Sequence, residues 1–173
     1  MVLHRERLQP SLLDRLTDDL ADRTGKGSGH GVMSSAELRR AVLRDLNWLL
    51  NTVRVESLLD LSDLTYARRS TLNYGIPDLA GRTVSGLEPK AVADSLRRAI
   101  LDFEPRLIAD SVRIKPEPGS APNALSFRIE AELWAQPVPL QLWLRTELDL
   151  DSGDVSVSEM EERDLDRRAS GGR

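Results

Sequence analysis

The spacing of the hydrophobic residues changes near position 110, and this change predicts the fold. Before it, apolar residues recur every three or four positions, as on the buried face of an amphipathic helix. After it, apolar and polar residues alternate, as in strands that bury one face of a sheet. The sequence therefore predicts an α+β domain in which N-terminal helices pack on a three- to four-stranded, mainly antiparallel sheet.

The first core helix is expected over residues 35–52. Ser34 and Glu37 match a capping box, in which the two side chains satisfy free amides at a helix start. The apolar residues that follow keep helical spacing, and we expect Trp48 to join them in the core.

Two further helices are expected before the sheet. A short one over residues 62–72 would carry Leu64, Arg68 and Leu72 on one side, and would end in the glycine- and proline-containing loop at 73–78. A longer one begins at Pro89, a residue favoured at the first helical position, and runs to about Phe103.

The alternating positions predict the strands. They include residues 112–114, 125–133, 140–148 and 155–157. Proline-rich breaks separate the first three, and residues 151–154 (DSGD) read as a hairpin turn before the last. Consecutive strands joined in this way form an antiparallel meander.

Three regions are expected along the chain. Residues 1–33 form an arm with a short helix and a glycine-rich linker, because a helix begins well at Pro10 and Ser11 and a GKGSGHG run follows. Residues 34–158 form one α+β domain. Residues 159–173 are charged, end in glycines, and are expected to be a disordered tail.

Composition excludes several functions. The chain has no cysteine, so disulfides, thiolate metal sites and a cysteine nucleophile are excluded. The net charge is −4, and the basic residues are scattered, which disfavours nucleic-acid binding. The first residues are charged and no apolar run reaches membrane-spanning length, so we expect a cytoplasmic protein without membrane insertion.

The usual signatures of catalysis are missing. His4 and His30 have no second ligand at metal-binding spacing, and no phosphate-binding loop or nucleophile elbow is present. We therefore expect no cofactor, no metal and no small-molecule substrate. The best acid for a two-carboxylate hydrolase is Glu104, but Arg106 beside it would favour the ionised carboxylate, and aromatic platforms for sugars are few.

One charged segment, residues 104–106, lies between the helix predicted to end near Phe103 and the predicted sheet. In one interpretation Glu104, Pro105 and Arg106 simply end the helix and solvate the turn. In the other, the proline fixes the backbone so that both charges project toward a partner, where arginine is a favoured interface residue. A turn and a ligand loop are likewise the two interpretations of Asn73, Tyr74 and Gly75. We expect all six residues to bind a partner.

Four segments together resemble a known family. They are residues 10–16 (PSLLDRL), 46–52 (LNWLLNT), 72–79 (LNYGIPDL) and 103–107 (FEPRL), and they occur in the same order and with similar spacing. The chain resembles TssE, the baseplate subunit family of type VI secretion systems, which is grouped with phage tail baseplate wedge proteins named lysozyme-like. The glycine-rich insert before the first core helix departs from that pattern.

The resemblance implies a structural role at the membrane-docked baseplate. Expected partners are the baseplate subunits TssF, TssG and TssK, and the sheath subunits TssB and TssC, whose first ring this protein would template. We expect the edges of the sheet to accept extended arms of the sheath, because strand edges carry unpaired backbone groups. A peptidoglycan hydrolase acting through Glu104 and an adaptor that sequesters a regulatory protein are the alternatives.

Overall fold

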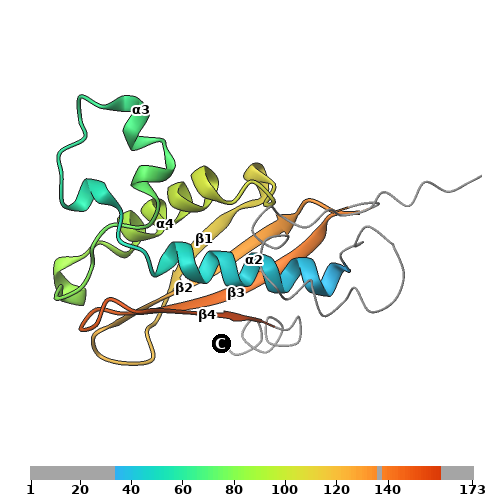
Figure 1. Ribbon diagram of the computed structural model, residues 1–173. Coiled ribbons are helices and arrows are strands. Elements are labelled where there is room, and N and C mark those ends of the chain that lie inside the picture. Colours follow the sequence, from blue (N-terminus) through green and yellow to red (C-terminus); the bar gives the residue numbers. More distant parts are fainter. Residues whose placement is uncertain (1–33, 136–137, 161–173) are drawn as a thin grey trace, which may run out of the picture.

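The protein combines helices with one antiparallel sheet, which confirms the expected α+β class. The computed structural model describes residues 34–160 except 136 and 137. The predicted N-terminal helix, the glycine-rich linker and the tail after residue 160 lie outside the described residues. In chain order the elements are the helices α2 (Ser35–Leu50), α3 (Thr65–Arg68) and α4 (Pro89–Phe103), then the strands β1 (Arg113–Glu117), β2 (Ala124–Leu133), β3 (Leu140–Asp149) and β4 (Val155–Glu159) (Figure 1).

Helix α2 begins at the predicted capping box. The Ser34 hydroxyl accepts a hydrogen bond from the Glu37 amide at 3.2 Å, and the Glu37 carboxylate accepts one from the Ser34 amide at 2.8 Å. Trp48, however, is not in the core, because its side chain is 48% exposed. Two residues after the buried Leu46, it is rotated by about 200° around the helix and so faces outward.

The helix predicted over residues 62–72 is wrong in length. Only the four residues of α3 are helical, and Thr71–Asn73 then forms a single 3₁₀ turn. Ser70 separates the two, because its hydroxyl accepts a hydrogen bond from the Leu72 amide. Leu64 and Leu72 are 55% and 71% exposed, so the predicted apolar stripe has no core to pack against.

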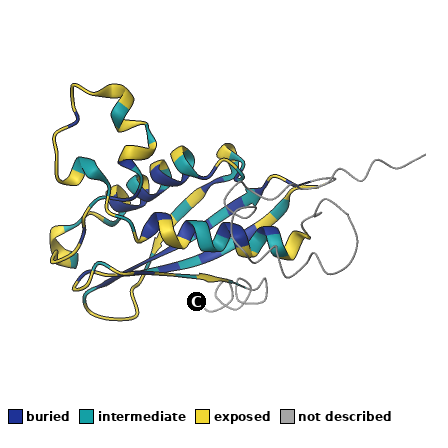
Figure 2. Ribbon diagram, viewed as in Figure 1, coloured by how far each residue is buried: buried dark blue, intermediate teal, exposed yellow. Residues whose placement is uncertain are grey.

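Helix α4 has the predicted start and end, and it covers the sheet together with α2 (Figures 1 and 2). The sheet order is β1-β2-β3-β4, with every neighbouring pair antiparallel. In the register between the central strands, Ile129 lies opposite Leu144. Both side chains are fully buried, as alternation predicts. Strand β1 continues through Pro116 and Glu117, into the region expected to be a break.

The strands β3 and β4 are joined by the expected tight turn. The Asp149 amide donates to the Asp154 carbonyl at 2.9 Å, and Gly153 has a φ of 83°. Strand β4 ends at Glu159, one residue after the expected domain boundary, and there Arg39 of α2 forms an ion pair with Glu159 at 2.6 Å. The first helix and the last strand of the described domain are therefore in direct contact.

Residues 54–74 form a lobe that stands away from the sheet (Figure 1). The lobe contains α3 and the 3₁₀ turns Val55–Ser57 and Thr71–Asn73, and most of its residues are exposed or half-buried (Figure 2). Two other 3₁₀ turns, Val84–Gly86 and Ala109–Ser111, flank α4. None of the helices in the described part of the chain is long and apolar enough to cross a membrane.

Candidate interaction surface around Arg106

The Glu104-Pro105-Arg106 segment turns the chain from α4 toward the sheet. Glu104 is the C-terminal cap of α4, and its amide donates to the Ile100 carbonyl at 2.9 Å. Its ψ of 79° takes the backbone out of the helical region, as the proline that follows requires. The Trp134 amide then donates to the Arg106 carbonyl at 2.8 Å, which fixes the segment to the end of β2.

The Glu104 side chain points inward and is only 3% exposed. Arg106 folds back over it, so that Nε lies 2.7 Å from Oε1 and Nη2 lies 2.5 Å from Oε2. This two-point pairing fixes the plane of the guanidinium. Both Glu104 oxygens are thereby engaged by one arginine.

Asp45 of α2 completes the cluster. Its Oδ2 lies 2.6 Å from Arg106 Nη2, and its Oδ1 lies 2.8 Å from Nη2 of Arg44. Burial lowers the pKa of Arg106, but hydrogen bonding and charge from Glu104, then from Asp45, outweigh that effect and raise the pKa overall. The guanidinium therefore stays charged, and it ties the junction after α4 to the middle of α2.

Tyr74 belongs to the same corner of the molecule. Its ring packs edge-to-face on Phe103 with the ring centroids 5.1 Å apart. Its hydroxyl donates to the Asp45 carbonyl at 3.4 Å. Burial raises the pKa of Tyr74, and the negative charges of Asp45 and Glu104 raise it further. Thus Tyr74 and the 104–106 segment, chosen separately from the sequence, meet around Asp45 and Phe103.

Asn73 and Gly75 hold the backbone next to that corner. The buried Asn73 side chain accepts from the Glu56 amide at 2.9 Å and donates to the Arg68 carbonyl at 3.0 Å, which closes the lobe at its base. Gly75 has a φ of 120°, and a Cβ there would lie 2.2 Å from the Thr52 carbonyl oxygen. Both residues therefore shape the fold, and their contact with a partner stays a prediction.

Comparison with known proteins identifies the family. Residues 36–138, more than half of the chain, match the model of the baseplate wedge protein gp25. The chain belongs to this family. No curated protein and no solved structure gives a match. Membership in a structural wedge family points to contact with other components of a phage-tail-like baseplate.

Two exposed tryptophans of this wedge protein extend the corner into a surface. The Arg44 guanidinium lies 5.1 Å from the centre of the Trp48 ring, and Arg44 also pairs with Asp45. Trp134 is 58% exposed, and its amide donates to the Arg106 carbonyl. We call this set the Arg106 surface; it comprises Arg44, Asp45, Trp48, Pro105, Arg106 and Trp134.

Sequence reasoning missed four of these residues, Arg44, Asp45, Trp48 and Trp134, and for the last three the reason can be named. Trp48 was assigned to the core because the helix is rich in apolar residues, although its angle from Leu46 places it outside. Trp134 follows the buried Leu133 in an alternating strand, so its outward position was readable. Nothing in the sequence around Asp45 indicates a role for it, because its partner Arg106 lies 61 positions away.

Proposed function

We propose that this wedge-family protein is the TssE-type baseplate subunit of a type VI secretion system. In this role it acts in the cytoplasm at the membrane-docked baseplate, binds TssF, TssG and TssK, and templates the first ring of the TssB and TssC sheath. The observation that carries the proposal is the Arg106 surface: contacts link the Glu-Pro-Arg segment of the resemblance to two exposed tryptophans, to Trp48 through Asp45 and Arg44 and to Trp134 through its backbone amide. Tryptophan and arginine are the residues most enriched at the energetic centres of protein interfaces.

The internal pairs of Arg106 suit it to this role. Glu104 and Asp45 hold the guanidinium before any partner arrives, so that binding costs little side-chain entropy. The side chain remains 24% exposed, and no described residue accepts a hydrogen bond from its Nη1. In this proposal the buried Glu104 fixes the orientation of the Arg106 guanidinium. Arg106 donates a hydrogen bond to the partner from Nη1, and Pro105 and the two tryptophans provide apolar contact.

The sheet offers one edge suited to a sheath arm. In β4 the amide of Met160 and the carbonyl of Asp154 bond to β3, so Val155, Val157 and Glu159 turn their backbone groups to the outer edge. The amide and carbonyl of Val155 already form hydrogen bonds with the Asn51 side chain. At the opposite edge, Pro116 of β1 lacks an amide. We therefore assign the sheath arm to β4 at residues 157–159.

Copurification with TssF and TssG tests the wedge contact. The variants Trp48→Ala and Trp134→Ala remove exposed aromatic area, so each should reduce recovery of the partners by about tenfold or more, as expected for interface centres. Asn47→Ala, an exposed neighbour of Trp48, is the matched control and should bind normally. Full recovery of both partners by both tryptophan variants would rule out the Arg106 surface as the wedge contact.

Sheath nucleation on assembled baseplates tests the β4 edge. Val157→Pro removes an outward amide and should block growth of TssB and TssC sheaths, seen by electron microscopy, while wedge copurification persists. Val157→Ala keeps the amide and serves as the control. Normal sheath growth from the proline variant would show that the arm binds elsewhere.

A further inference from the structure

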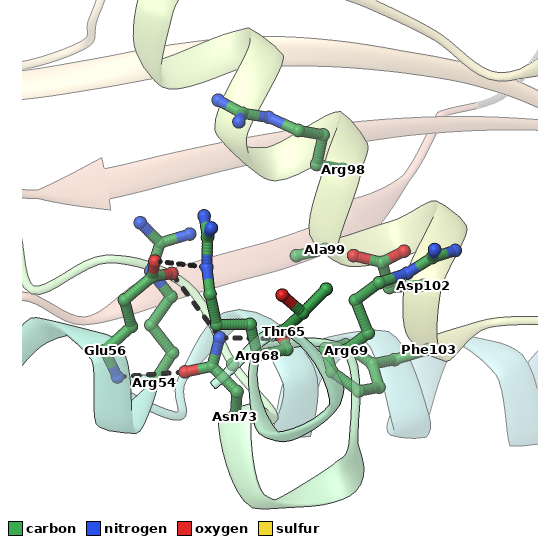
Figure 3. A pocket seen from close by; sticks show the side chains of 11 residues that line it. Arg54, Glu56, Thr65, Arg68, Arg69, Asn73, Arg98, Ala99, Asp102 and Phe103 are labelled. Carbon is green, nitrogen blue, oxygen red and sulfur yellow. Dashed lines mark hydrogen bonds and ion pairs between the residues drawn. The ribbon is translucent and has the colours of Figure 1, made fainter. Parts of the chain in front are cut away.

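A concave site lies between the lobe and α4. It encloses about 240 Å³, and Figure 3 shows side chains from both elements around it. Phe103 lines it from α4, and Gly75 lines it from the residue just after the lobe. The site therefore adjoins the corner at Tyr74 but does not include the Arg106 surface. Its charged lining residues are Arg54, Glu56, Arg68, Arg69, Arg98 and Asp102.

The pocket is positively charged in a protein whose net charge is negative. Four arginines and two carboxylates line it, which gives the lining a charge of +2. Glu56 is already engaged, since it lies 2.9 Å from Arg68 Nε and 3.6 Å from Arg54 Nε. Arg54 Nε is nevertheless buried without a hydrogen-bond acceptor in the described part of the chain. Such a donor is costly to leave unsatisfied.

Two arginines of the pocket, Arg69 and Arg98, form no ion pair with a described residue, although Asp102 lines the same pocket. Among described residues, no carboxylate lies within ion-pair distance of Arg69 or Arg98, and Arg98 Nε donates only to the Asp94 carbonyl of its own helix, at 3.4 Å. Arg69 follows α3 and Arg98 belongs to α4, and both residues line the pocket. Figure 3 shows the Arg69 guanidinium beside Asp102 and the Arg98 side chain on the other side of the pocket. Positive charges that line a recess attract an oxyanion more strongly than the same charges spread over a flat surface.

The lobe beside the pocket is unusually apolar for an exposed segment. Five of the nine exposed large apolar side chains in the described residues belong to it, and Tyr66 of α3 is 93% exposed. The others are Leu58, Leu59, Leu64 and Leu72. Clusters of exposed apolar side chains mark protein-binding surfaces.

We propose that the lobe and its pocket bind an acidic, apolar-flanked segment of a partner protein. A carboxylate of that segment enters the pocket between Arg69 and Arg98, and its apolar neighbours pack on the lobe. Charge complementarity selects the carboxylate, and the exposed leucines select a protein segment over a free phosphate. That this partner is another baseplate component rests on the proposed function. The binding of an acidic protein segment in the pocket does not.

A titration of the full chain with model ligands tests this site. The probes are a short peptide of alternating leucine and glutamate, the same peptide with lysine in place of glutamate, and inorganic phosphate. Backbone amide shifts in NMR spectra report where each probe binds. The Leu-Glu peptide should shift amides near Arg69 and Arg98, and the lysine peptide should not.

Paired charge reversals provide the decisive comparison. Arg69→Glu with Arg98→Glu should weaken binding of the Leu-Glu peptide by about tenfold or more, because two attractions become repulsions. Arg40→Glu with Arg82→Glu changes the net charge equally at exposed positions outside the pocket, and should leave binding within about twofold. Equal weakening in both pairs, shifts confined to another face, or tighter binding of phosphate than of the peptide would each overturn the proposal.

The wedge contact can fail independently of this site. If both Trp48→Ala and Trp134→Ala copurify normally with their partners while the peptide binds the pocket, the Arg106 surface is wrong and the pocket stands. If the pocket variants bind the peptide unchanged while Trp134→Ala loses its partners, the reverse holds. Circular dichroism of each variant confirms that the fold is retained.

Discussion

Asn51 occupies both main-chain groups of Val155. Its Nδ2 donates to the Val155 carbonyl at 2.8 Å, and its Oδ1 accepts from the Val155 amide at 2.9 Å. The C-terminal cap of α2 therefore pairs with the outer edge of β4 much as one residue of a further strand would. The side chain fixes the helix to the sheet and also marks where the open part of the edge begins.

Removing the side-chain amide of Asn51 should lower the stability of the domain. Asn51→Ala leaves the Val155 groups without their partner, so the free energy of unfolding should fall by about 1–2 kcal/mol in urea denaturation. Asn47→Ala is the control, because the main contact of Asn47 with Asn51 uses its backbone carbonyl, and its stability should change by less than about 0.5 kcal/mol. Equal losses in the two variants would contradict a specific role for the Asn51 clamp.

Removing Arg106 should cost more than removing an ordinary surface charge. Arg106→Ala leaves the buried Glu104 carboxylate without its partner, and we expect a loss of about 2–4 kcal/mol in the free energy of unfolding. Adding Glu104→Gln to that variant removes the isolated charge and should recover part of the loss. A double variant less stable than Arg106→Ala would show that the cost arises elsewhere.

Gly75 should not tolerate a side chain. Gly75→Ala would place a Cβ against the Thr52 carbonyl at a φ of 120°, so we expect a loss of at least about 2 kcal/mol or failure to fold. Gly86→Ala is a suitable comparison, since a Cβ there meets only the Thr83 hydroxyl at 3.2 Å, on an exposed turn. Thermal unfolding of the two variants distinguishes them, and similar melting temperatures would refute the close approach at Gly75.

Tyr74 should titrate at unusually high pH. Its folded-state pKa is raised above the ordinary tyrosine value of about 10, so its contribution to stability is complete below that pH and is lost as pH rises through the folded pKa. Absorbance titration of a Tyr66→Phe variant isolates Tyr74, because the chain has two tyrosines. In the same background, Asp45→Asn should lower the Tyr74 pKa. An unchanged titration would exclude that charge as a cause.

The spacing of hydrophobic residues was sufficient to predict the helices and strands that bury one face. The stripe along α4 and the alternation in β2 and β3 give the core directly, because burial sets both patterns. The predicted helix over residues 62–72 was wrong because the spacing of Leu64 and Leu72 resembles that of core residues, although both side chains are exposed. Spacing reveals which residues could share a face, but whether a partner element covers that face is a matter of tertiary structure.

The candidate site was only partly readable for a different reason. Glu104 and Arg106 are two positions apart, so their pairing could be foreseen, but the burial of one and the exposure of the other could not. Asp45 joins them from α2, 61 positions earlier in the chain, and a single sequence carries no trace of that contact. Tyr74 was chosen from its loop context, and only the structure shows that it meets the same cluster.

The contact between α2 and β4 has a consequence for how the chain folds as it leaves the ribosome. Synthesis makes α2 first and β4 last, yet Arg39 binds Glu159 and Asn51 binds Val155. The β2–β3 hairpin can form as soon as both strands have emerged, whereas α2 can contact α4 earlier but lacks its contacts with β4 until the last strand emerges. A nascent chain halted before residue 155 should therefore expose this helix to chaperones, and the domain should close only when its last strand appears.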